Sequence, residues 1–247
     1  MNAAIQSLSC AESIKCRLEE YLAAVSQALG GQLLGIYIFG SLARGCFNET
    51  TSDIDLMVIS DSTCSPDAVS QISTAHQRLA LAVDAVFISS QQVNHNSVPT
   101  PIDFLLKPEG SIIRKAAGSL DFIINRQDVY DCGIAVFGPE AKHLVKAVPW
   151  ELQKEAITQL YPFVIARFKN PVLMLCRMVY ALCNQQLCSK VAAGKWALSA
   201  FAAEWSQLIN RGLAEYCSGV TANNSNKDTL NQFGRYCSAY IKDHQQE

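Results

Sequence analysis

The sequence predicts an α/β domain, a small mixed sheet with helices, followed by an all-α helical bundle. Two observations predict this. Apolar runs of strand length, separated by polar turns, lie before residue 139, whereas from Pro149 onward apolar residues recur every three or four positions. The 247 residues suffice for two modest domains, and hydrophobic residues, at 49%, can supply their cores. We therefore expect domains at 1–147 and 148–247.

Composition and charge narrow the class of protein. A net charge of −2 gives no support for general nucleic-acid binding. No apolar run reaches membrane-spanning length. The ten cysteines contain no Cys-x-x-Cys pair, so we expect reduced, mostly buried thiols, and the four scattered histidines argue against zinc. These features favour a cytoplasmic monomer that binds neither nucleic acid nor membrane.

Hydrophobic spacing predicts the elements in order along the first domain. The first helix is expected to end at Gly30-Gly31, and Gly138-Pro139 closes the domain. Residues 102–120 follow no clear pattern. The remaining expected elements are a helix over 3–29, strands over 36–39 and 56–59, a helix over 68–80, a strand over 81–88, and a helix with a short edge strand over 120–139.

The second domain is expected to be helical throughout, apart from a polar loop over 220–228. A helical domain after a small sheet domain suggests an active site in the cleft between them. The expected helices cover 150–161, 171–185, 190–210 and 231–244.

Two acidic residues stand at the head of the second expected strand. Asp53 and Asp55 point to one side, with Ile54 opposite, and carboxylate oxygens suit a divalent metal. Gly40-Ser41 leaves the preceding strand in a turn, where backbone N–H groups can approach a phosphate. Either pattern alone is more often a plain turn or a solvated strand end. Their combination indicates a phosphoryl-transfer site.

Asp84 interrupts the third expected strand. A carboxylate inside an apolar strand is costly unless it is paired or binds metal. It could be a strand-end acid bonded to backbone. The functional interpretation is favoured because this strand should lie beside the one that carries Asp53 and Asp55.

The segments 40–45, Gly-Ser-Leu-Ala-Arg-Gly, and 52–56, Ser-Asp-Ile-Asp-Leu, resemble the signature of the nucleotidyltransferase superfamily. Residues 170–180 and 189–197, together with 138–141, resemble streptomycin/spectinomycin adenylyltransferases. The similarity covers nearly the whole chain. It implies an enzyme that uses Mg²⁺ and ATP as co-substrate to move AMP onto an acceptor hydroxyl, with release of pyrophosphate.

The resemblance also implies residue roles. Gly40 and Ser41 would hold the triphosphate, Asp53 and Asp55 would hold magnesium, and Asp84 would be a third ligand or the general base. The closest resistance enzymes often have glutamate at this last position, so the shorter aspartate could move the base by roughly 1 Å. Further nucleotide-binding positions, each of which alone could be a surface, capping or core residue, are Ser52, Asp121, Arg177, Lys190 and Tyr216.

The acceptor side departs from the family pattern. No tryptophan lies over 101–120, where the family places a stacking ring, and Arg167 and Lys169 stand where streptomycin-modifying members offer acids. Residues 148–247 contain 10 basic and 7 acidic side chains, which suits an anionic ligand better than a cationic drug. Three hypotheses stay open: an adenylyltransferase for spectinomycin or an unusual aminoglycoside, the same chemistry on a metabolite or protein hydroxyl, and a non-catalytic nucleotide-binding or interaction protein.

Overall fold

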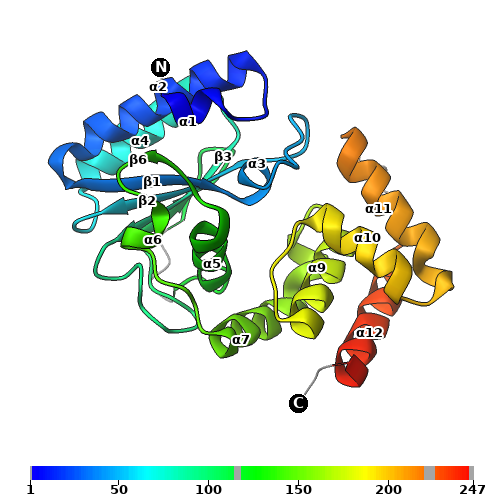
Figure 1. Ribbon diagram of the computed structural model, residues 1–247. Coiled ribbons are helices and arrows are strands. Elements are labelled where there is room, and N and C mark those ends of the chain that lie inside the picture. The colour runs from blue at the N-terminus through cyan, green and yellow to red at the C-terminus, as the bar shows by residue number, and fades with distance from the viewer. Residues whose placement is uncertain (1, 114–117, 220–225, 245–247) are drawn as a thin grey trace. The chain divides into compact units, whose positions relative to one another are not determined.

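The computed structural model describes residues 2–113, 118–219 and 226–244. The chain divides into two compact units, Met1–Leu152 and Gln153–Glu247. The first unit contains a sheet with helices and the second is helical, so the predicted fold class is confirmed (Figure 1). Each unit is described by itself below.

The first unit is organised around a mixed six-stranded sheet with the order β5-β4-β3-β2-β1-β6. β2 and β3 are parallel and the other pairs are antiparallel. The predicted edge strand after residue 132 is confirmed as β6. The strands are β1 (Leu33–Phe39), β2 (Ile54–Ser60), β3 (Val83–Ser89), β4 (Phe104–Leu106), β5 (Ile112–Ile113) and β6 (Ile134–Phe137).

Alternation along the strands produces two cores, one on each face of the sheet. Leu56 and Val58 of β2 pack in a core with α2 (Glu12–Leu29) and α4 (Pro66–Leu79). Met57 and Ile59 pack on the opposite side with α5 (Phe122–Cys132). Figure 1 shows α2 and α4 covering one face and α5 the other. Side chains at odd-numbered positions of β2 therefore face α5.

Two local predictions for this unit were incomplete. The expected first helix is two helices, α1 (Ala3–Gln6) and α2, because Ser7 bonds Ala4 O through its hydroxyl at 2.8 Å and Ala11 is extended. The expected turn after β1 begins as a short helix, α3 (Gly40–Ala43). Short strands β4 and β5 occupy part of the region without a clear pattern, and α6 (Ala141–Leu144) follows β6.

The second unit confirms the helical prediction but not all of its boundaries. The prediction of a single helix over 190–210 is wrong. The helix α10 (Lys190–Ala200) ends where Phe201 becomes extended, and Ala202 N donates to Tyr236 Oη at 2.8 Å. Part of the expected 220–228 loop lies outside the described residues, and the last helix starts earlier than expected. The helix α7 (Trp150–Leu160) begins in the last residues of the first unit. The other helical elements of the second unit are η2 (Tyr161–Phe163), α8 (Val164–Arg167), α9 (Pro171–Asn184), η3 (Ala203–Trp205), α11 (Ser206–Ser218) and α12 (Lys227–His244).

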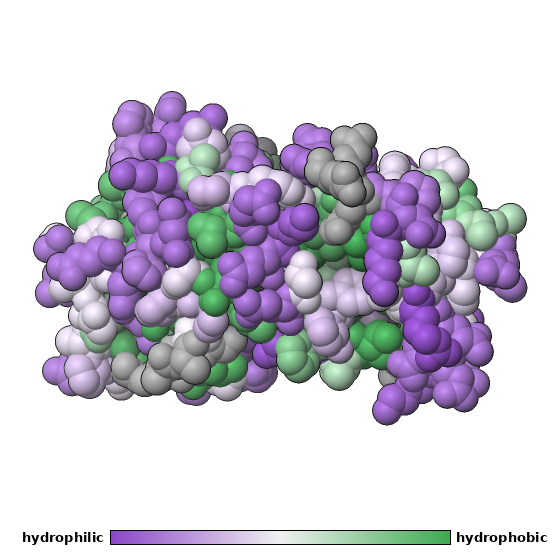
Figure 2. All heavy atoms as spheres, turned by 90° about the horizontal axis from the view of Figure 1, so that it is seen from below, coloured by the Kyte–Doolittle hydropathy of each residue, from purple (hydrophilic) through white to green (hydrophobic). Residues whose placement is uncertain are grey.

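The surface is mixed in character. Figure 2 shows hydrophilic side chains over much of one face, with apolar atoms in smaller patches between them. Among the described helices, none combines the length and apolar character needed to cross a membrane.

Candidate active site

The acidic residues of the sheet meet at the end where β2 and β3 begin. Asp55 and Asp84 are register partners on these parallel strands, and both alternate onto the α5 face. Asp53 lies just before β2. On the side of Asp84 away from Asp55, its Oδ2 forms an ion pair with Lys107 Nζ at 2.6 Å. The structure thus brings the three predicted carboxylates to one end of the sheet, and it adds a lysine that sequence analysis missed.

The surroundings of Asp84 make its ionised form less favourable than that of an ordinary aspartate. Partial burial raises the pKa of the Asp84 carboxyl above its usual value, and the negative charges of Asp53 and Asp121 raise it further. Lys107 opposes this through its charge and hydrogen bond, without cancelling it. A carboxylate with a raised pKa is a stronger proton acceptor than an ordinary aspartate, which suits a general base.

The Gly-Ser turn lies directly against Asp55. Phe39, the last residue of β1, is the register partner of Asp55, and Gly40 follows with φ of 66°. A Cβ on Gly40 would lie 2.0 Å from Asp55 Oδ2, so any other residue would be strained there and would displace the Asp55 carboxylate. Ser41 Oγ is buried, and no described residue gives it a hydrogen-bond partner. A buried hydroxyl of this kind fits a ligand with hydrogen-bonding oxygens, such as a phosphate.

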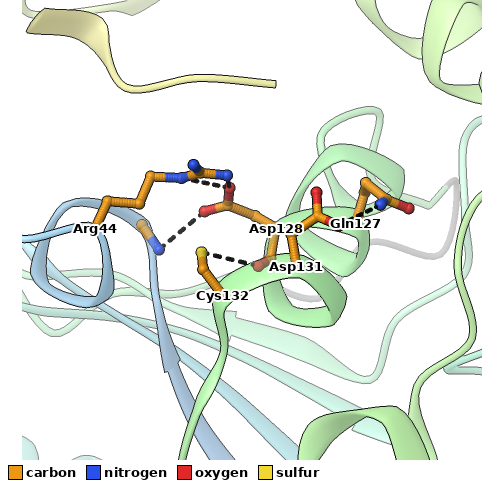
Figure 3. A network of polar contacts seen from close by, with 6 residues as sticks. Arg44, Gln127, Asp128, Asp131 and Cys132 are labelled. Atoms are coloured by element: carbon orange, nitrogen blue, oxygen red, sulfur yellow. Dashed lines mark hydrogen bonds and ion pairs between the residues drawn. The ribbon is translucent and has the colours of Figure 1, made fainter. Parts of the chain in front are cut away.

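Asp128 of α5 holds this turn in place (Figure 3). Its carboxylate accepts a hydrogen bond from Gly40 N at 3.0 Å and another from Arg44 Nε at 2.9 Å, and it also pairs with Arg44 Nη2. The Asp128 side chain is only 3% exposed. Sequence analysis missed this contact, because Asp128 follows the polar residues 125–127 and its partners Gly40 and Arg44 are far away along the chain.

Two other predicted residues have defined places near these elements. Asp121 stands at the N-cap of α5 but makes no capping bond with its side chain; its carboxylate accepts from Ser119 Oγ at 3.0 Å. Its influence on Asp84 places it in the same electrostatic environment. Ser52 Oγ accepts from Asn48 N at 3.1 Å and thereby closes the loop that leads into β2.

The remaining predicted residues belong to the helical unit. Lys190 is the first residue of α10, and its Nζ lies 5.6 Å from the centre of the Tyr216 ring on α11, a cation–π contact. Arg177 lies on α9, which packs against both α10 and α11.

An open cavity of about 570 Å³ in the helical unit is lined by none of the predicted site residues. Its lining includes Tyr161, Leu175, Arg235 and Lys242.

The chemistry of the donor set fits magnesium bound together with a nucleotide. Within the described ranges, no group of three His, Cys, Asp or Glu side chains is arranged to hold a metal ion by itself. Mg²⁺ commonly uses one or two carboxylates and completes its shell with substrate phosphates and water. Asp53 and Asp55 can supply that pair, whereas Asp84 is already bonded to Lys107.

Comparisons with known proteins agree with this arrangement. Residues 18–108 match the family model described as nucleotidyltransferase domain, and residues 141–240 match that of aminoglycoside adenylyltransferase, C-terminal domain. Spectinomycin 9-adenylyltransferase of Campylobacter jejuni is 23% identical over 83% of this chain and 86% of its own length. The enzyme of the same name from Staphylococcus aureus strain Mu50 is 21% identical over 76% of this chain and 80% of its own length.

A solved structure shares the fold. It is spectinomycin adenyltransferase AAD(9) from Enterococcus faecialis with ATP and spectinomycin, which matches with a TM-score of 0.79 at 17% identity and covers 92% of this chain and 98% of that one. The two family matches follow each other along the sequence in the order of the two observed units. The chain is therefore an aminoglycoside adenylyltransferase-like member of the nucleotidyltransferase superfamily.

Proposed function

We propose that this protein transfers AMP from Mg-ATP to a hydroxyl of spectinomycin and releases pyrophosphate. One observation carries the proposal: the Gly40-Ser41 turn lies directly against Asp55, which is itself the register partner of Asp84. The turn proposed to bind phosphate, the carboxylate proposed to hold the metal and the proposed proton acceptor are thereby adjacent, which supports adenylyl transfer.

The transfer begins with a spectinomycin hydroxyl facing the α-phosphorus of ATP. Asp84 accepts the hydroxyl proton while the oxygen attacks in line; the new O–P bond forms as the bond to the β-phosphate oxygen breaks, and pyrophosphate leaves with those electrons. Asp53 and Asp55 would hold Mg²⁺, which supplies charge neutralisation on the phosphates when bound. Ser41 Oγ and the backbone of the turn would donate to phosphate oxygens.

Nucleotide-binding roles are also proposed for residues of the helical unit. Lys190 and Arg177 would contribute positive charge to the triphosphate, and Tyr216, already in contact with Lys190, would hold that lysine and face the nucleotide. In the first unit, Asp121 and Ser52 would have supporting roles, Asp121 through the charge it places near Asp84 and Ser52 by closing the loop before β2.

Spectinomycin is proposed as the acceptor in preference to streptomycin. The relatives and the solved structure bear names that specify spectinomycin. This chain also lacks a tryptophan over 101–120 and carries Arg167 and Lys169 where acids would suit a streptomycin-like polycation. Arg167 lies 5.6 Å from the centre of the exposed Phe163 ring, which keeps its positive charge at the surface and disfavours a more highly charged drug.

The test is pyrophosphate release from ATP and Mg²⁺ in the presence of spectinomycin, streptomycin or other aminoglycosides. We expect pyrophosphate release with spectinomycin and with none of the other drugs, together with an AMP-spectinomycin product of the corresponding mass. Asp53→Asn provides the inactive control, because it removes one proposed metal ligand with little change in size. Binding of ATP without release for any drug would reject spectinomycin and direct the search to metabolite or protein hydroxyls.

A further inference from the structure

A row of charged residues crosses three neighbouring strands at the catalytic end of the sheet. Asp55 and Asp84 are partners across β2 and β3. Ala85 pairs with Leu106 across the antiparallel β3 and β4, so Lys107, the next residue, lies opposite Asp84. The order across the sheet is carboxylate, carboxylate, ammonium, and the central carboxylate contacts the ammonium at 2.6 Å.

Lys107 is presented by a fixed turn. Its backbone N donates to Ser111 O at 2.9 Å, and its carbonyl accepts from Gly110 N at 2.7 Å. Gly110 has φ of 87°, a conformation that favours glycine, and the neighbouring Pro108 O lies 3.2 Å from His76 Nε2 on α4. The backbone of the lysine is therefore held on both sides, and its ammonium reaches Asp84 from a defined position.

The ion pair engages only one of the two carboxylate oxygens of Asp84. Oδ2 is occupied by Lys107. Among the residues that the structure describes, none forms a hydrogen bond to Oδ1. Side-chain exposures of 30% for Lys107 and 27% for Asp84 leave the pair accessible to a substrate. One oxygen is thus anchored by the protein and the other is available to an incoming hydroxyl.

We infer that Lys107 is a positioning residue that assigns Asp84 to proton acceptance and keeps it out of the metal-binding set, which is left to Asp53 and Asp55. The inference rests on the proposed function for its catalytic part. Lys107 itself gains and loses no proton: it anchors Oδ2, and the proton of the acceptor hydroxyl moves to Asp84. An ammonium at 2.6 Å also repels a divalent cation from the same carboxylate.

Metal binding tests the assignment without an acceptor. Mn²⁺ titrations in the presence of a non-hydrolysable ATP analogue should show binding weakened about tenfold or more by Asp55→Asn and changed less than about twofold by Asp84→Asn. Lys107→Met should tighten Mn²⁺ binding by about threefold or more, because it frees Asp84 to join the metal set. That gain should disappear in the double variant Lys107→Met/Asp84→Asn, which separates direct ligation from a general change in charge.

Steady-state kinetics test the catalytic part. Lys107→Met should lower kcat about tenfold to a hundredfold while the KM for ATP stays within about twofold, and Lys107→Arg should restore part of the rate. Lys142→Met, which removes an exposed lysine of the same unit, is the matched control and should retain full activity. Circular dichroism melts of each variant establish that it is folded.

Three results would overturn the inference. The first is weaker Mn²⁺ binding in Asp84→Asn comparable to that in Asp55→Asn, which would make Asp84 a metal ligand. The second is a raised KM for ATP with unchanged kcat in Lys107→Met, which would make the lysine a phosphate contact. The third is an unchanged kcat in that variant. If the wild-type protein modifies no drug, the proposed function fails, while the Mn²⁺ titrations still decide the role of Lys107.

Discussion

Asp128 accepts a hydrogen bond from the backbone N–H of Gly40 at 3.0 Å, although 88 residues separate them along the chain. The same carboxylate pairs with Arg44, so one buried acid on α5 fixes both ends of α3. The Gly40-Ser41 turn, which we propose binds phosphate, is therefore anchored by the helix that Asp121 directly precedes.

Asp128→Asn should impair both stability and activity. The substitution preserves size but leaves the guanidinium of Arg44 without its charged partner, so we expect a loss of about 2–3 kcal/mol in the free energy of unfolding, measured with urea. Displacement of the turn should also lower kcat. Asp131→Asn is the control: it lies on the same helix, is exposed, and accepts a hydrogen bond from Gln127. Equal effects of the two substitutions would contradict a special role for Asp128.

Gly40→Ala should abolish activity, whereas Gly45→Ala should not. Both glycines have φ of 66°, so alanine is strained at either position by about 1 kcal/mol. Only at Gly40 would the added Cβ collide with Asp55; at Gly45 it meets nothing within 4 Å. Pyrophosphate release and thermal melts of the two variants measure the difference. Comparable activity in both would show that contact with Asp55 is unimportant.

The pH dependence of the reaction should reflect Asp84. A general base must be ionised, and because the pKa of Asp84 is raised, kcat/KM should fall on the acidic side with a midpoint above that of an ordinary aspartate. For stability the sign is opposite: the folded state holds this proton more tightly, so the contribution of Asp84 is present at low pH and lost as pH rises through its folded pKa. A kcat/KM profile for the wild-type protein measures the midpoint, and the residual activity of Asp84→Asn should lack this acidic limb.

Thiol reactivity should separate the cysteines by environment. Burial raises the pKa of Cys176 to about 12 and also raises that of Cys237, so both should resist alkylation in the native state. Cys16 and Cys217 are exposed and should react with iodoacetamide first. Mass spectrometry of samples taken during the alkylation measures the order in which the cysteines are modified. Early modification of Cys176 in folded protein would contradict the described helical packing.

The sequence predicted the order of elements where one local pattern dominated. The apolar runs around Asp55 and Asp84 predicted strands because their length and their continuous apolar character both indicate buried strands. It did not predict the break at Phe201, because the contacts of that ring with Tyr236 and Tyr240 of α12 are tertiary. Lys107 and Asp128 were missed for the same reason. Their partners are distant in sequence, and nothing in the local pattern names an ion-pair partner 23 or 84 residues away.

The parallel register of β2 and β3 has a consequence for how such an enzyme can change. Asp55 and Asp84 belong to the strand ladder, so a slip of one residue would turn either acid into the core shared with α2 and α4. The spacing of these two carboxylates is therefore protected from insertions in neighbouring loops. New acceptors can arise through changes in loops and helices, while the chemistry of the transferred phosphate stays tied to the hydrogen bonds of the sheet.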